Sequence, residues 1–211
     1  MVNSSGIPVK TILFLDGISI LKIDFIIWKS ILNNMLRISL GSDCSIAYNL
    51  QRLGYRKFSF PFDWILSRDL SVLTNDFQDF LDVNFLKIKG KVNFCKVDED
   101  FSHLEEEMLR IKHVRYDLEF LHDFTNFEDI KIVKEKYDRR IERFYSVMRD
   151  EKIEKHLYRI SKYDEREEIE KIFVEKNFVN FQLHIKLYSE FPPCKDWKRL
   201  EFNWETWFGN F

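Results

Sequence analysis

Apolar and polar residues follow one another along the first half of the chain in patterns that predict short elements. Residues 36–40 form an apolar run typical of a strand, and residues 44–53 repeat apolar side chains at helical spacing. An aromatic loop that contains a proline spans residues 58–65. Residues 67–82 again place apolar side chains three to four positions apart, which predicts a second helix.

The second half of the chain alternates between strand and helix patterns more regularly. Residues 114–120 and 181–187 alternate apolar and polar side chains, which predicts half-buried strands, and residues 155–161 predict a further short strand. Helical stripes lie between them, over residues 129–148 and 165–173. Strands that alternate with helices favour βαβ units. We therefore predict an α/β fold class, a single domain in which helices flank a mixed sheet.

The N-terminal segment, residues 1–34, differs from the rest of the chain. It is apolar, but charged residues interrupt it, which argues against both a membrane span and a signal peptide. The stretch that begins at Met35 has the pattern of a domain start. We predict an N-terminal extension over residues 1–34 and the functional domain over residues 35–211. In the alternative, the first segment adds a strand and a helix to that domain.

The balance of charge narrows the classes of partner. The chain has 33 Lys and Arg residues against 35 Asp and Glu residues, a net charge of −2. Neither a nucleic-acid partner nor a polybasic membrane patch is therefore predicted. The 21 phenylalanines and the scarcity of alanine point to an AT-rich genome, which weakens any interpretation of the aromatic residues as a base-stacking platform.

The cysteines and the missing motifs limit the chemistry further. Cysteines at positions 44, 95 and 194 have neither the spacing of a disulfide framework nor that of a zinc site. They predict a reducing compartment, the cytoplasm. Nucleotide-binding glycine motifs, HExxH and GxSxG do not occur in the sequence, so we predict no cofactor and no metal. The oligomeric state stays open.

Cys44 is the candidate nucleophile, because it stands at the start of a predicted helix directly after a predicted strand. Backbone N–H groups and the macrodipole of a helix start favour the reactive thiolate, if Ser42 or Asp43 caps the helix. The same amides could stabilise an oxyanion. The carboxylate of Asp43 works against a thiolate, and in the alternative interpretation Cys44 is a small apolar residue of the core.

His122 is the histidine best placed to serve such a nucleophile. It continues the apolar face of the predicted strand to its end, and Asp123 follows it as a carboxylate that could orient the ring. Asp63, between two aromatic residues of the loop, could orient the ring instead or cap the next helix. In the alternative, His122 is a core histidine bonded to a backbone carbonyl.

Five successive blocks of the sequence carry a family resemblance: SLGSDCSIAYNLQRLG, SFPFDWIL, NDFQDFLD, YDLEFLHDF and YDRRIERFYSV. Over residues 36–149 the chain resembles the uncharacterised family described as "putative papain-like cysteine peptidases", which occurs in bacteria and large DNA viruses. The resemblance implies an α+β papain-like fold as the alternative to the α/β one. It also implies functional roles for the matching residues, Cys44, Asp63, His122 and Asp123.

The first hypothesis is a thiol hydrolase, that is, a cysteine peptidase or a related acyl transferase. Cys44 attacks an amide, isopeptide or thioester bond of a peptide or acyl substrate, His122 relays the proton, and Asp123 or Asp63 orients the imidazole. If the protein is viral, the compartment is the host cytoplasm.

Two other classes of function stay open on the sequence alone. One is a non-catalytic binding module with a pocket lined by Phe62 and Trp64. The other is an interaction protein that docks through an aromatic C-terminus, which requires an exposed apolar patch around residues 197–208.

Overall fold

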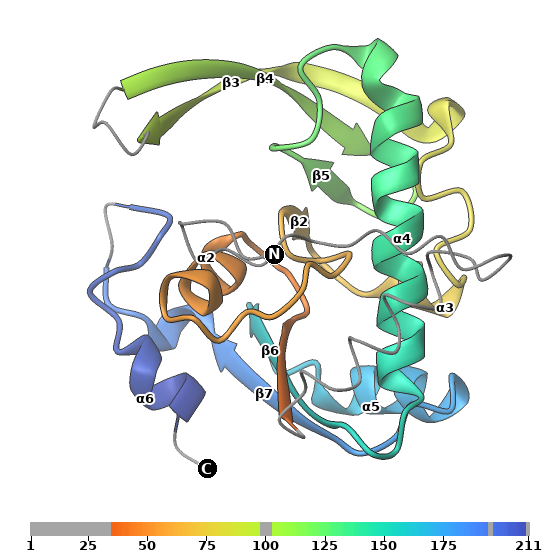
Figure 1. The fold of residues 1–211 in the computed structure, drawn as a ribbon, viewed down its shortest axis with the longest axis vertical. Helices are drawn as coiled ribbons and strands as arrows, with labels where there is room; N and C mark the ends of the chain where they lie inside the picture. Colours follow the sequence, from red (N-terminus) through yellow and green to blue (C-terminus); the bar gives the residue numbers. More distant parts are fainter. Residues whose placement is uncertain (1–34, 98–102, 194–195, 210–211) are drawn as a thin grey trace, which may run out of the picture. The chain divides into compact units, whose positions relative to one another are not determined.

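Parallel and antiparallel strand pairs of this chain lie in two separate sheets (Figure 1). The computed structural model describes residues 35–97, 103–193 and 196–209. The predicted extension, residues 1–34, lies outside the described residues. The helices and strands are β1 (Met35–Ser39), α2 (Ser45–Arg52), β2 (Ile65–Ser67), α3 (Ser71–Thr74), β3 (Leu86–Val97), β4 (His103–His113), β5 (Leu118–Phe120), α4 (Ile130–Met148), β6 (Glu154–Ser161), α5 (Arg166–Glu175), β7 (Phe181–Leu187) and α6 (Trp204–Gly209).

The parallel sheet has the strand order β1-β6-β7. Its central strand β6 is buried at successive residues, which means that both faces of the sheet are covered. The helix α5 connects β6 to β7 and buries Ile169 and Phe173, so these three elements form a βαβ unit. The predicted α/β class with flanking helices is thereby confirmed.

The antiparallel sheet has the strand order β2-β5-β4-β3. Its two long strands, β3 and β4, form the extended ribbon in Figure 1, and their register shifts between Ile88 and Gly90. The short strand β5 pairs with both β4 and β2. The structure thus refines the predicted mixed sheet, because the two pairing directions belong to different sheets.

The strand predicted over residues 114–120 is wrong in its first half. Strand β4 ends at His113, a turn follows, and only Leu118–Phe120 forms β5. The ring of His113 stabilises this turn, since its Nδ1 accepts a hydrogen bond of 3.2 Å from the Tyr116 amide and the two rings stack. Asp117 closes the turn with a φ of +47°. His113 is therefore a buried core residue.

The helix predicted over residues 67–82 is also wrong except for one turn in its middle, because Ser67 still belongs to β2. Only Ser71–Thr74 is helical, and tight turns follow. Asp76, Phe77 and Asp79 have positive φ values, which a continuous helix does not allow. Asp tolerates this conformation, and the turns bury the Phe77 ring 5.5 Å from the ring of Phe62.

The long helix predicted over residues 129–148 is confirmed as α4. It packs against β5 and against the loop before β7, because the ring of Tyr137 lies 5.6 Å from that of Phe120 and the ring of Phe144 lies 5.7 Å from that of Phe178. In Figure 1, α4 extends from the antiparallel sheet to the region of α5.

Two of the C-terminal aromatic residues, Trp204 and Phe208, belong to the core. Trp204 and Phe208 of α6 are 1% and 0% exposed, and they pack with Ile46 and Leu50 of α2 and with Tyr158 of β6. This burial takes Trp204 and Phe208 out of the exposed patch that the docking hypothesis requires, while Trp197 and Leu200 stay 42% and 49% exposed.

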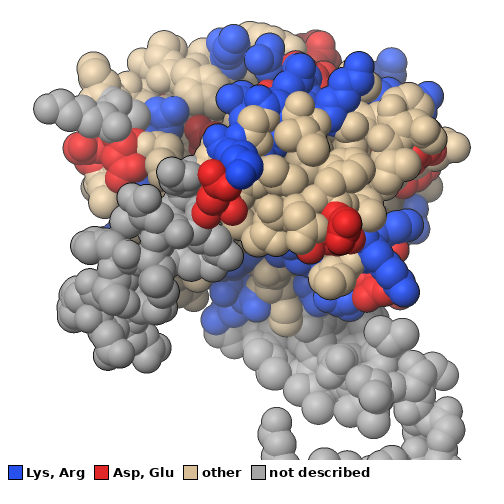
Figure 2. Space-filling view, turned by 90° about the horizontal axis from the view of Figure 1, so that it is seen from above, with Lys and Arg blue, Asp and Glu red and all other residues tan. Residues whose placement is uncertain are grey.

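The surface carries both signs of charge. Lys and Arg side chains gather along one margin of the face in Figure 2, with Asp and Glu scattered among them. On the antiparallel sheet, Lys112 pairs with Asp117 and Arg110 pairs with Glu119. Within the described part of the chain, no helix combines the length and apolarity that crossing a bilayer requires.

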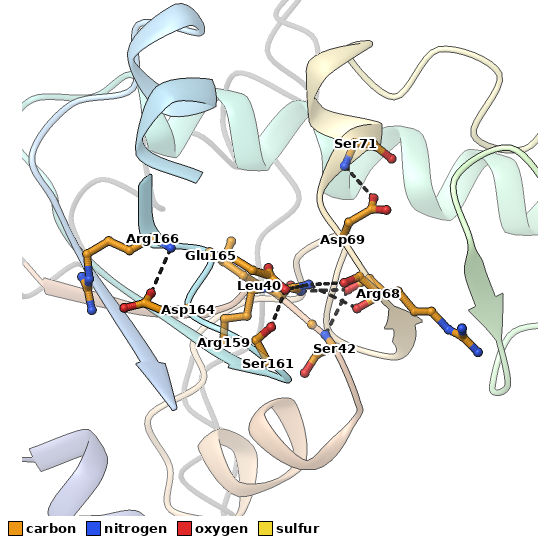
Figure 3. A network of polar contacts seen from close by, with 12 residues as sticks. Leu40, Ser42, Arg68, Asp69, Ser71, Arg159, Ser161, Asp164, Glu165 and Arg166 are labelled. Atoms are coloured by element: carbon orange, nitrogen blue, oxygen red, sulfur yellow. Dashed lines mark hydrogen bonds and ion pairs between the residues drawn. The ribbon is translucent and has the colours of Figure 1, made fainter. Parts of the chain in front are cut away.

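A buried arginine joins the two sheets (Figure 3). Arg159 of β6 is paired with Glu165, at 2.5 Å from Nε to Oε2. Its other nitrogens donate to the carbonyls of Leu40, Ser67 and Arg68, which follow β1 and end β2. One guanidinium thus ties the parallel sheet to the antiparallel sheet.

Replacing this arginine is expected to destabilise the fold strongly. Arg159→Met leaves the Glu165 carboxylate buried without its cation, and the free energy of unfolding should fall by about 3–5 kcal/mol. Chemical denaturation monitored by circular dichroism measures this change. In the double variant with Glu165→Leu, which removes the stranded charge, part of the loss should be recovered.

Arg68→Met is the matched control, because the Arg68 side chain is 71% exposed and pairs with Asp117 at the surface. Its cost should stay below about 1 kcal/mol. Equal destabilisation by both replacements would contradict the joining role of Arg159.

Candidate active site

Cys44 lies at the carboxyl end of the parallel sheet, immediately after β1. The chain leaves β1, turns at Gly41 and Ser42 with φ values of +76° and +79°, and enters α2. Cys44 is the N-cap residue of α2 and is 4% exposed. This corrects the expectation that Ser42 or Asp43 caps the helix. Ligands of open α/β sheets bind at this edge, where helices begin.

Three features hold the turn before Cys44 in place. A Cβ atom at Gly41 would lie 2.6 Å from Oγ of Ser67, so the close approach of β2 requires a glycine there. The Ser42 amide donates to the same Oγ at 3.0 Å. Asp43 Oδ1 accepts from the Ser45 amide at 2.9 Å, which fixes the first turn of α2. The position of Cys44 is therefore set by hydrogen bonds from backbone amides to the side chains of Ser67 and Asp43.

The electrostatics around the thiol differ from the expectation. Burial raises the pKa of Cys44 far above the ordinary 9.0, and the carboxylates of Asp43, Asp123 and Asp63 raise this pKa further. These effects outweigh the short helix α2, whose start we expected to lower the pKa. Cys44 is thus a protonated thiol at neutral pH, surrounded by carboxylates.

His122 follows β5 and lies between two tryptophans. Its ring centre is 5.5 Å from that of Trp64 and 6.4 Å from that of Trp197. Trp197 in turn contacts Tyr48 at 5.4 Å, and Tyr48 stands one helical turn after Cys44 on the same face of α2. These ring contacts link His122 to α2 through Trp197 and Tyr48.

The protonation of His122 follows from the same surroundings. Burial lowers its pKa below the ordinary 6.5, and the negative charge of Asp123 partly opposes this shift. The imidazole is therefore neutral at pH 7, the form that accepts a proton.

Asp123 is held by two donors from α4. Its Oδ1 accepts from Nζ of Lys136 at 2.5 Å, and its Oδ2 accepts from the hydroxyl of Tyr137 at 2.8 Å. Burial and the nearby Asp123 raise the pKa of Tyr137, and Cys44 contributes to the same shift. Tyr137 therefore lies close to both Asp123 and Cys44. Helix α4 thus fixes the Asp123 carboxylate, whose charge acts on Cys44 and His122.

Asp63 is committed to a different set of contacts. Its Oδ2 accepts from Nη2 of Arg56 at 2.8 Å and from the Phe60 amide at 2.8 Å. Burial raises the pKa of Asp63, while Arg56 opposes the shift. At the start of the next helix, α3, the Ser71 amide donates a hydrogen bond to the side chain of Asp69. The alternative role of Asp63 as the cap of this helix is therefore wrong. These bonds hold the loop that presents Trp64.

Sequence reasoning missed the cations that hold these carboxylates. Arg56, Lys136 and Arg199 pair with Asp63, Asp123 and Asp43. The sequence contained one signal for the partner of Asp123. Tyr137 lies on the buried stripe of the predicted helix, and a buried tyrosine hydroxyl needs a hydrogen-bond partner.

A cavity of about 260 Å³ lies away from these residues, between the turns after α3 and the helix α4. Its lining is Phe77, Asp79, Phe80, Leu81, Asp82, Lys134, Asp138 and Ile141. None of the four candidate residues lines it. Among the described residues, no group of His, Cys, Asp and Glu side chains is arranged to hold a metal ion.

Comparison with known proteins identifies the family. Residues 35–182 match the family described as "Putative papain-like cysteine peptidase", and the chain belongs to this family. The match includes Cys44, Asp63, His122 and Asp123 and begins where the described structure begins.

One curated relative is a protein of Acanthamoeba polyphaga mimivirus that is described as uncharacterized. It is 34% identical over 127 residues, which are 54% of this chain and 57% of the relative. The chain thus spans a little over half the length of this relative. No solved structure matches the chain.

The raised pKa of Cys44 predicts slow alkylation. At about pH 7, iodoacetamide should modify Cys44 at least about tenfold more slowly than it modifies a free thiol, because the thiolate is the reacting form. The rate should rise continuously as the pH increases beyond 9.0, the ordinary pKa. Peptide mass spectrometry separates this site from the other cysteines.

Asp43→Asn provides the internal comparison. Removing this carboxylate should lower the pKa of Cys44 and speed its alkylation several-fold. Fast modification of the unaltered protein below about pH 7 would contradict the protonated thiol.

Proposed function

We propose that the protein is a thiol hydrolase, a cysteine peptidase or related acyl transferase, in which Cys44 is the nucleophile and His122 the base. The observation that carries this proposal is the position of Asp123, whose charge acts on both the Cys44 thiol and the His122 imidazole. Membership of the family supports the same reaction class.

The two reacting groups begin as a neutral pair. A thiol with a raised pKa beside an imidazole with a lowered pKa disfavours the thiolate–imidazolium pair in the resting protein. His122 therefore takes the proton from Cys44 as the sulfur attacks, which is general-base catalysis. Asp123, held by Lys136 and Tyr137, stabilises the imidazolium that forms.

The reaction proceeds through an acyl-enzyme. The sulfur forms a bond to the carbonyl carbon, and the bond to the leaving amine or thiol breaks as that group takes the proton from the imidazolium of His122. Water then attacks the thioester, gives its proton to His122 and releases the acid, and the proton returns to Cys44. An amine in place of water makes the same step an acyl transfer.

Backbone amides at the start of α2 serve the oxyanion. The first bond within α2 runs from the Tyr48 amide to the Cys44 carbonyl at 3.0 Å. The amides of Ile46 and Ala47 precede it and belong to the helix terminus, next to the attacking sulfur.

The substrate is an acyl compound or a peptide that reaches the site past Trp64 and Trp197. A free thiol nucleophile fits a reducing compartment, and we propose the cytoplasm, or the host cytoplasm for a viral protein. The binding-module alternative is disfavoured because Phe62, a lining residue of its expected pocket, is 0% exposed.

Acyl-enzyme trapping tests the proposed function. Incubation with p-nitrophenyl acetate should release p-nitrophenol and leave an acetyl group on Cys44, detected by peptide mass spectrometry. Cys44→Ala should abolish this adduct, and His122→Ala should slow its formation at least about 100-fold. The rate should fall as the pH decreases through the pKa of His122, which burial holds below 6.5.

His184→Gln is the control, because it removes another half-buried imidazole, on β7, that contacts His156. Its acetylation rate should match that of the unaltered protein. Unchanged acetylation of His122→Ala, or an adduct on residues other than Cys44, would refute the assigned roles.

A further inference from the structure

One face of α4 is directed at the loops that carry the candidate residues. Lys136 and Tyr137 bind Asp123, and Arg143 donates from Nη1 to the carbonyl of Ser59 at 2.8 Å. Arg140 lies between them on this face, one helical turn after Lys136 and one before Arg143.

Arg140 differs from its neighbours in one respect. Its Nη1 is buried and has no hydrogen-bond partner. The guanidinium lies over the ring of Tyr137, with its Cζ atom 5.1 Å from the ring centre. The charge of Arg140 also lowers the pKa of Asp63 and of Tyr137, so it lies close to the groups that surround Cys44.

Each carboxylate around the thiol already has a cation. Asp63 pairs with Arg56, Asp123 with Lys136 and Asp43 with Arg199. Arg140 therefore adds a positive charge that these pairs do not neutralise. A buried N–H of a charged group is costly without an acceptor, and a bound anion would supply one.

We propose that Arg140 binds a carboxylate of the substrate and thereby selects acyl groups or peptides with an acidic group near the scissile bond. Guanidinium groups recognise carboxylates through paired, charge-assisted hydrogen bonds, and Arg140 as a whole residue is only half-buried although its Nη1 is buried. The proposal rests on the proposed function, because it names the substrate class of that same site.

The kinetic test compares charged with neutral acyl donors. The unaltered protein should hydrolyse at least one of the p-nitrophenyl monoesters of succinate, glutarate and adipate more efficiently than p-nitrophenyl butyrate. Arg140→Gln should lower kcat/KM for the preferred monoester by about 10- to 100-fold and change butyrate hydrolysis little. Arg139→Gln is the matched control, since Arg139 is the adjacent, exposed arginine of α4 and should leave the preference intact.

A binding test keeps the proposal separate from catalysis. Cys44→Ser protein should bind the monomethyl ester of the preferred diacid, and Arg140→Gln in that background should weaken binding about tenfold or more. The neutral dimethyl ester should bind equally to both proteins. Calorimetry measures both affinities.

The outcomes of the two tests are distinct. Turnover that depends on Cys44 but shows no preference for monoesters, or an equal loss in Arg139→Gln, overturns the role of Arg140 and leaves the proposed function standing. If no ester is turned over through Cys44, the proposed function fails. Binding that depends on Arg140 then still supports a carboxylate site, and its absence overturns that site as well.

Discussion

The buried ion pair of Arg159 and Glu165 is the interaction on which the rest of the structure depends. A guanidinium in the core costs several kcal/mol of free energy unless its donors are satisfied. The carboxylate of Glu165 and the backbone carbonyls that follow β1 and end β2 satisfy them. The ends of β1 and β2 are therefore held at one point. The loop that carries Cys44 starts from this point, and β2, which directly follows Trp64, ends there.

Much of the fold could be predicted from periodicity, because the parallel sheet and α4 bury continuous stripes. The strand over residues 155–161 and the helix over residues 129–148 are therefore found where the pattern places them. Two other patterns mislead for a physical reason. The segments 67–82 and 114–120 bury aromatic side chains through turns with positive φ, and side-chain spacing alone does not distinguish such turns from a helix or a strand. The division into two sheets depends on contacts between distant residues, above all those of Arg159.

The candidate site could also be predicted only in part from the sequence. The positions of Cys44, His122 and Asp123 follow from local patterns, namely the start of a helix and the end of a strand. The protonation of the Cys44 thiol could not be predicted from local patterns, because it depends on burial and on carboxylates from three separate segments. The cations that balance these carboxylates also come from distant elements. The resulting site differs from the thiolate that a helix start predicts, because the Cys44 thiol and the His122 imidazole are both neutral at pH 7.

The most direct test of this account is whether Cys44 and His122 meet in solution. Dibromoacetone, whose two reactive carbons flank a single carbonyl, can join a sulfur to a nitrogen only when the two side chains lie close together. After long incubation above neutral pH, the account predicts one cross-linked species in which peptides containing Cys44 and His122 are joined, and its loss in His122→Ala. Alkylation of Cys44 without this cross-link would contradict the central claim that the two residues form one site.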